Sequence, residues 1–346
     1  MPSDALSIRS LARSLGLSRT TVSDALRGAP GVSAATVLRV RTAAAKTGYR
    51  LNPLESAVMS QLRRTRGTQR FGILAAVDLD ESDRPPTALQ FHQALIEGAR
   101  RRAGEFGFDL QVFLVGRHGV TVQRLDVILQ ARGIQGVLLL PAWHEPDFSR
   151  LDWSRFVGVY TDYVIQHPAL HSVCADHYRA LIGLLGRLQQ LGYRRPGLFV
   201  QQHSDERLHY RWVGALNGYQ RAHPEMARVP ALVFEKFEPA RFTAWFRRHR
   251  PDVVLGHIPE AIDLMQAAGA RVPETHGFVC LNVLPEGRKC AGLDLQPRLL
   301  GERGVELLIA QLQRNERGIP DFPLNTMVPA RWVDGPTLRA VAEPGR

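Results

Sequence analysis

The first fifty residues place apolar side chains at intervals of three and four, the spacing of short amphipathic helices. Gly16 permits a tight turn after the first helix, and Ser18 and Ser33 are predicted to cap the second and third. Two helices joined by a tight turn and supported by a third form a helix-turn-helix, whose second helix enters the DNA major groove. An ordinary three-helix bundle is the alternative. The predicted inner faces are Ile8, Leu11, Ala12 and Leu15, then Val22, Ala25 and Leu26, then Val37, Val40 and Ala44.

From residue 70 onward, short apolar runs alternate with amphipathic helical segments. This alternation predicts parallel sheets with helices on both faces, and the pattern occurs twice, so two α/β subdomains are expected. Ligands of such pairs bind between the subdomains, at the carboxyl ends of the strands. The predicted strands include residues 70–78, 109–115, 136–142 and 156–162 in the first series and 231–234, 251–257 and 277–282 in the second.

The chain therefore divides into a small helical part and a large α/β core. We expect a DNA-binding headpiece over residues 1–51, a hinge helix and linker over 52–69, and a core over 70–346. The first subdomain is expected to hold residues 70–165 with a crossover near 290–325. The second is expected to hold residues 166–290 and the C-terminal tail.

Charge separates these two parts further. The 346 residues carry a net charge of +11, and residues 1–70 contain twelve arginines and lysines against three carboxylates. Positive charge concentrated on one small part indicates a polyanionic partner such as nucleic acid. A solvated basic tail is the alternative.

Other features narrow the class of protein. No secretory signal and no apolar run long enough to cross a membrane are visible, so a cytoplasmic protein is expected. The three cysteines form no C-x-x-C pair and are predicted to be buried and reduced. No H-E-x-x-H, G-x-S-x-G, G-x-G-x-x-G or P-loop motif is present, so we expect neither an enzyme nor a cofactor or metal site.

Residues 7–58 resemble the DNA-binding headpiece and hinge of the lactose/galactose repressor (LacI/GalR) family. The matching stretches are S-I-R-S-L-A-R-S-L-G-L-S-R-T-T-V-S, then G-x-S-x-x-T, then G-Y-R-L-N-P-L. The resemblance implies that Arg19, Thr20 and Asp24 face the major groove. It also implies that a hinge helix inserts an apolar side chain into the minor groove, where this chain has Val58 in place of the usual Leu. The implied DNA-binding residues are Ser7, Ser18, Arg19, Thr20, Thr21, Ser23, Asp24, Arg27, Ser33, Thr36, Asn52, Leu54 and Val58.

The core resembles the regulatory core of the same family, which is like a periplasmic sugar-binding protein. GYRRPGLF, RWVG, RVPETHGFVCLN and QPRLLG fit the family's patterns. The resemblance implies that Arg211, in RWVG, grips an effector in the cleft, with a helix-surface salt bridge as the alternative. Asn282 stands where the family usually has a ligand-binding Asp.

Three further effector candidates come from strand ends. Asp162 and Asp78 end predicted strands on the cleft side, and each could instead cap the next helix. His257 ends the strand in VVLGHIPEA, a stretch about four residues shorter than the family's usual A-N-D-x-x-A segment. A hydrogen-bonded loop histidine with no ligand is the alternative there.

Together these patterns predict a transcriptional regulator, in the repressing direction that is commoner in the family. A homodimer would bind near-palindromic double-stranded DNA, and a small molecule such as a sugar, bound between the subdomains, would change the DNA affinity. A solute-binding protein of periplasmic type without a transcriptional role is the alternative.

Overall fold

The structure is a computed structural model. It describes residues 8–27, 32–47, 72–163, 165–285 and 287–339. The candidates Ser7, Asn52, Leu54 and Val58, and the predicted hinge helix, lie outside these residues. No helix in the described ranges is both long enough and apolar enough to span a membrane.

The N-terminal part is the predicted three-helix unit, and we call it the headpiece. Gly16 has a left-handed φ of +64°, which allows the tight turn between the first two helices. Ser18 and Ser33 cap as predicted, because their hydroxyls accept the backbone N–H of Thr21 and Thr36 at 3.0 and 3.3 Å. The headpiece helices are α1 (Ile8–Leu15), α2 (Arg19–Arg27) and α3 (Ala34–Thr47). Its buried core is Leu11, Ala12, Val22, Ala25, Val40 and Ala44.

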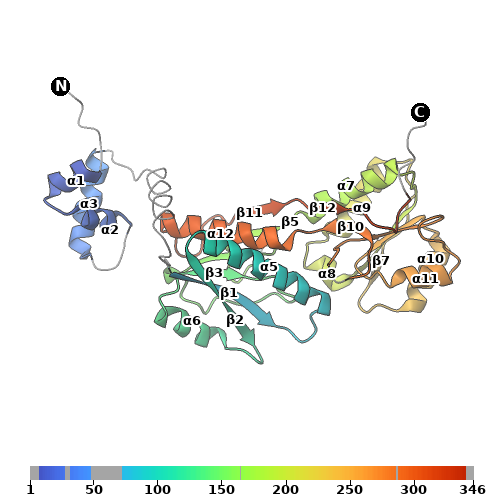
Figure 1. Ribbon diagram of the computed structural model, residues 1–346, viewed down its shortest axis with the longest axis horizontal. Helices are drawn as coiled ribbons and strands as arrows, with labels where there is room; N and C mark the ends of the chain where they lie inside the picture. Colours follow the sequence, from blue (N-terminus) through green and yellow to red (C-terminus); the bar gives the residue numbers. More distant parts are fainter. Residues whose placement is uncertain (1–7, 28–31, 48–71, 164, 286, 340–346) are drawn as a thin grey trace, which may run out of the picture.

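The core consists of two six-stranded sheets, each with its own helices (Figure 1). In spatial order the first sheet is β11 (Asn325–Val328), β5 (His171–Ala175), β4 (Val157–Tyr160), β3 (Gly136–Leu139), β1 (Gly72–Asp80) and β2 (Phe108–Gly116). The second is β12 (Arg331–Val333), β10 (Ala291–Asp294), β9 (Gly277–Cys280), β8 (Val253–Gly256), β6 (Pro196–Gln201) and β7 (Leu232–Phe234). The sheet of the first subdomain is parallel throughout. The second sheet is parallel except that β10 and β12 pair antiparallel.

Helices cover these sheets because their apolar faces pack against buried strands. Burial is complete along the short strands β3, β4, β8 and β9, as expected of parallel strands covered on both faces. The first subdomain has α5 (Pro86–Glu105), α6 (Val122–Ala131) and α12 (Pro297–Arg314). The second has α7 (His177–Gln190), α8 (Gln202–Glu206), α9 (Arg211–Ala222), α10 (Pro239–His249) and α11 (Ala261–Ala267).

The chain passes between the subdomains three times: after β5, between β10 and α12, and between β11 and β12. The predicted first boundary near residue 165 is too early. Strand β5 still belongs to the first sheet, because His171 and Ser172 pair with Val159 and Tyr160 of β4. The return to the first subdomain after β10 agrees with the crossover expected near residue 290.

Two glycines bring α5 and α12 into backbone contact, and Figure 1 shows these helices side by side. A Cβ on Gly98 would lie 2.0 Å from the carbonyl oxygen of Arg298, and one on Gly301 would lie 2.0 Å from that of Leu95. These distances leave no room for a methyl group. Glycine at both positions therefore sets how closely the C-terminal helix α12 packs on the first subdomain.

We expect Gly98→Ala to lower the free energy of unfolding by about 1–3 kcal/mol, the usual cost of overpacking. Gly104→Ala is the matched control at an exposed position of the same helix, because a Cβ there meets nothing within 4 Å. That control should stabilise the protein by about 0.5–1 kcal/mol through helix propensity. Urea unfolding of the two variants measures both effects. Equal stability of the two variants would contradict the close packing of α5 and α12.

Candidate functional site

A cavity of about 450 Å³ lies between the two subdomains. It is lined from the first subdomain by residues after β1, β3, β4 and β5, and from the second by residues after β6, β8 and β9. These are the carboxyl ends of parallel strands, where ligands of such folds bind. The cavity therefore lies where the sequence predicts a ligand site.

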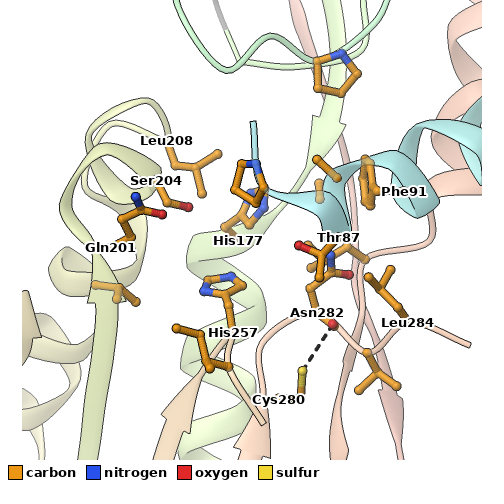
Figure 2. Close-up of a pocket in the computed structure, with 18 of the residues that line it drawn as sticks. Thr87, Phe91, His177, Gln201, Ser204, Leu208, His257, Cys280, Asn282 and Leu284 are labelled. Carbon is orange, nitrogen blue, oxygen red and sulfur yellow. Dashed lines mark hydrogen bonds between the residues drawn. The ribbon is translucent and has the colours of Figure 1, made fainter. Parts of the chain in front are cut away.

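Apolar and polar side chains are arranged unevenly around this cavity (Figure 2). Phe91 and Leu284 lie on one side, and Leu208 lies on the other with Ser204 and Gln201. His177 and His257 lie between these two sides. A mostly apolar wall with a few polar groups is typical of small-molecule sites.

His177 is held in one tautomer. The hydroxyl of Tyr163 donates its single hydrogen to the carbonyl oxygen of Ala175. The contact of 2.9 Å between that hydroxyl and Nδ1 of His177 therefore requires Nδ1 to be the donor. Burial, with the positive charge of Arg207 as a second cause, lowers the pKa of His177 to about 3. His177 is therefore neutral at pH 7, and its Nε2 is a hydrogen-bond acceptor.

His257 is the second neutral imidazole of the cavity. Burial lowers its pKa to about 4, and the charge of Arg207 contributes again. Its ring stands edge-on to Trp212, with centroids 5.8 Å apart. His257 thus lines the cavity as predicted, and at pH 7 its uncharged ring has one N–H donor and one acceptor nitrogen.

Asn282 also lines the cavity, directly after β9. Its backbone carbonyl accepts a hydrogen bond from Sγ of Cys280 at 3.2 Å. Its side-chain oxygen is buried and has no hydrogen-bond partner among the described residues. A buried polar group without a partner is costly, so this amide is available to a ligand.

The interior charges of the cavity are paired. Asp162, predicted from the end of β4, lines the cavity and forms an ion pair with Arg207 at 3.0 Å. Asp162 also accepts the backbone N–H of Tyr163, so it does not cap a helix. The carboxylate and the guanidinium offset each other, and the lining between the subdomains is close to neutral.

The other two predicted effector residues lie outside the cavity lining. Asp78 binds Arg84 and His92, each at 3.0 Å. Burial would raise the pKa of Asp78, but the hydrogen bonds and positive charges of His92 and Arg84 outweigh it and lower the pKa. The guanidinium of Arg211 lies over the ring of Tyr163, 4.4 Å from its centroid, and its Nε is buried without a hydrogen-bond partner among the described residues.

The DNA-binding candidates that the structure describes lie on or beside α2 and at the start of α3. Arg19, Thr20, Thr21, Ser23, Asp24 and Arg27 all belong to α2. The hydroxyls of Ser18 and Thr21 bond to each other at 2.8 Å, as do those of Ser33 and Thr36 at 2.9 Å. Both pairs stand at the exposed N-terminal ends of helices, where backbone N–H groups favour phosphate.

The headpiece resembles a known family of regulators. Residues 7–52 match the model of the bacterial regulatory proteins of the lacI family. A curated relative, an HTH-type transcriptional regulator of Mycolicibacterium smegmatis, is 29% identical over 196 residues. That match covers 56% of this chain and 51% of the relative, so it spans about half of the relative's length.

Solved structures of regulators share the fold over nearly the whole chain. A complex of the transcriptional regulator CelR with cellobiose is 21% identical, with a TM-score of 0.59, and covers 96% of this chain and 99% of its own. The lac repressor dimer bound to operator and the anti-inducer ONPF is 19% identical, with a TM-score of 0.58 and the same coverage. A LacI-family regulator from Silicibacter pomeroyi is 17% identical, with a TM-score of 0.55, and covers 97% of this chain and 100% of its own. The predicted fold class is confirmed.

Several residues of this cavity were not predicted from the sequence, among them Trp143, His177 and Arg207. Trp143 and His177 follow β3 and β5 closely, so the strand-end reasoning that selected Asp162 and His257 applies equally to them. Arg207 precedes Arg211 by four residues, but a left-handed break at His209 and Tyr210 separates them. Sequence spacing alone therefore did not indicate that Arg207 faces the cavity.

The two neutral histidines make the core sensitive to acid. Their pKa values are lower in the folded chain than the usual value near 6.5 in the unfolded chain, so the unfolded chain binds more protons as pH falls. Their contribution to stability is present above pH 6.5 and is lost as pH falls toward 4.

Between pH 6 and 4.5, the slope of the unfolding free energy against pH measures how many more protons the unfolded chain binds than the folded chain. In His257→Gln, this slope should decrease by the equivalent of about one proton. Urea titrations at several pH values measure this slope, and an unchanged slope would contradict the low pKa of His257.

Proposed function

We propose that this chain is a sequence-specific DNA-binding transcriptional regulator of the LacI family, and that it acts as a repressor. A small molecule bound between the two subdomains modulates its affinity for operator DNA. The observation that carries the proposal is the combination in one chain: helices that match the lacI family precede a two-subdomain core with a cavity at its strand ends. A regulator of chromosomal DNA acts in the cytoplasm.

In the proposed complex, α2 lies in the major groove. Arg19, Thr20 and Asp24 would meet base edges, because they lie on the first two turns of that helix. An aspartate accepts from cytosine N4, whereas an arginine donates to guanine, so Asp24 favours an operator different from one read by arginine. The hydroxyls of Ser18, Thr21, Ser33 and Thr36 and the side chains of Ser23 and Arg27 would contact phosphates or the adjacent groove.

The symmetry of the proposed complex follows from two copies of the chain. A homodimer binding through two headpieces requires a near-palindromic site, with half-sites on one side of the duplex. The lac repressor structure that shares this fold is a dimer bound to operator. An effector that binds the open and closed arrangements of the subdomains unequally would change the DNA affinity by that difference.

The cavity supports an uncharged effector with hydrogen-bond donors. Both histidines are neutral, and the charge of Arg207 is offset by Asp162. His177 Nε2 is an acceptor, and the side-chain oxygen of Asn282 is an acceptor buried without a partner among the described residues. Hydroxyl groups supply such donors, and the apolar wall around Phe91 suits a ring face, so sugars are the first class to test. The similar CelR structure holds cellobiose.

A solute-binding protein of transport is the competing function, because the core fold alone would suit it. The LacI-family match over residues 7–52 favours the regulator instead.

Selection from a random-sequence DNA pool tests the proposed function. The full-length protein should recover a two-fold symmetric site. Asp24→Arg should recover a symmetric site with different preferred bases in each half, because an acceptor is replaced by a bidentate donor. Arg155→Gln, which removes a distant arginine from the core surface, is the control and should select the same site as the original protein.

Absence of any symmetric site with full-length protein would contradict the regulator. Unchanged bases with Asp24→Arg would show that Asp24 does not face the groove.

Thermal unfolding with matched pairs of small molecules tests the effector class. Uncharged sugars such as glucose and cellobiose should raise the melting temperature more than gluconate or glucose 6-phosphate, because the lining carries no unpaired positive charge. Asn282→Leu should remove the shift that any binding sugar causes. An undiminished shift in Arg211→Ala would exclude Arg211 from the effector site. A larger shift with an acid than with its uncharged counterpart would contradict the proposed class.

A further inference from the structure

An ion pair joins the two subdomains across the cavity. Asp162 follows β4 of the first subdomain, and Arg207 follows α8 of the second. Their side chains meet at 3.0 Å and are 12% and 23% exposed. A partly buried pair is screened less by solvent than a surface pair, and loss of one partner leaves the other charge poorly solvated.

A second contact crosses at the same place. Nε2 of His203, on α8, donates a hydrogen bond of 2.6 Å to the carbonyl oxygen of Trp143, which follows β3. The two rings are also in edge-on contact, with centroids 4.8 Å apart. The guanidinium of Arg207 lies 5.8 Å from the centroid of the Trp143 ring, so both contacts form one cluster.

The first subdomain holds its half of the cluster firmly. The carboxylate of Glu81 accepts the backbone N–H groups of Trp143 and His144 at 2.8–2.9 Å. Glu81 is itself paired with Arg84 at 2.8 Å. The loop that carries Trp143 is therefore fixed to the end of β1.

The second subdomain holds the other half through Asp205. This buried carboxylate accepts the backbone N–H of Trp212 at 2.9 Å and so joins α8 to the start of α9. His209 and Tyr210 between the two helices have left-handed φ values of 55° and 56°. A strained connection of this kind persists only where its surroundings hold it, so α8 has a set position relative to α9.

We propose that Asp162, Arg207, Trp143 and His203 form a latch that keeps the subdomains closed over the cavity without a ligand. Arg207 is the central residue of the latch, because its guanidinium contacts both Asp162 and the ring of Trp143 across the cavity. Asp162 and Arg207 both line the cavity, so an effector of the proposed function would bind beside their contact. The part that the latch has in regulation rests on the proposed function, whereas closure itself needs neither DNA nor effector.

The chain contains its own reporters of closure. Cys174 in the first subdomain and Cys280 in the second line the cavity, whereas Cys290 is buried outside the lining. Burial raises the pKa of Cys174 to about 12 and that of Cys280 to about 11. Both thiols are therefore unreactive while the cavity is closed, and opening makes them accessible and more acidic.

Site-resolved labelling with a bulky fluorescent maleimide at pH 8 tests the latch on the full-length protein. In Arg207→Gln, Cys174 and Cys280 should react about fivefold faster than in the original protein, a factor typical of one lost ion pair. Cys290 should keep its rate. Peptide mass spectrometry quantifies each cysteine separately.

Three further variants separate a latch from a general loss of structure. Arg155→Gln removes an ion pair within the first subdomain and should label at the original rate. Arg207→Lys keeps the charge without the guanidinium fork and should give intermediate rates. Asp162→Asn combined with Arg207→Gln should label no faster than the faster single variant, because both remove one interaction.

Unchanged rates at Cys174 and Cys280 in Arg207→Gln would overturn the latch, and so would an equal increase at Cys290. Neither result would bear on operator binding, which the DNA selection decides independently.

Discussion

The arrangement of the core depends on three chain crossings that lie side by side. The first follows β5 and the third follows β11, and these strands pair so that Ala175 lies opposite Val328. The second follows β10, whose Asp294 lies opposite Arg331 just after the third crossing. Three short, adjacent connections let the subdomains rotate about one line, but they prevent sliding or separation. The cavity and the contacts across it open or close as one unit for this reason.

Electrostatic neutrality is the second constraint on this cleft. Closing the subdomains removes Asp162, Arg207, His177 and His257 from water, and an unpaired charge there would oppose closure strongly. The chain avoids that cost by pairing the first two and keeping both imidazoles neutral. The same neutrality that permits closure also disfavours a charged effector, so the energetics of the fold and the chemistry of the proposed ligand are linked.

Much of this architecture follows from patterns along the chain. Apolar residues spaced three and four apart predicted α1 to α3 and their inner faces. The caps at Ser18 and Ser33 were predictable because the first backbone N–H groups of a helix need an acceptor outside it. Short apolar runs in the sequence predicted strands such as β3 and β8. The strands β5, β10, β11 and β12 were not predicted, because they are three to five residues long and include polar side chains such as His171 and Arg331. Such short strands are determined by their neighbours in the sheet and not by their own sequence.

The site was predictable where position along a strand decides it and unpredictable where distant partners decide it. Asp162, His257 and Asn282 line the cavity because each follows a parallel strand. Asp78 lies near the same edge of the first sheet, but Arg84 and His92 bind its carboxylate. Arg207 depends on Asp162, 45 positions away in the other subdomain, so no local pattern indicates it.

If the cleft closes without a ligand, the strength of that closure determines the effector concentration needed for a response. When only the open fraction of the protein can admit ligand, the apparent dissociation constant equals the intrinsic one divided by that fraction. A stronger contact between Asp162 and Arg207 lowers the open fraction and raises the effector concentration needed for a response. The pair lies beside His177 and Asn282, the proposed ligand-binding groups, without replacing them. Substitutions at this pair can therefore tune sensitivity while leaving the choice of effector to the acceptors and the apolar wall.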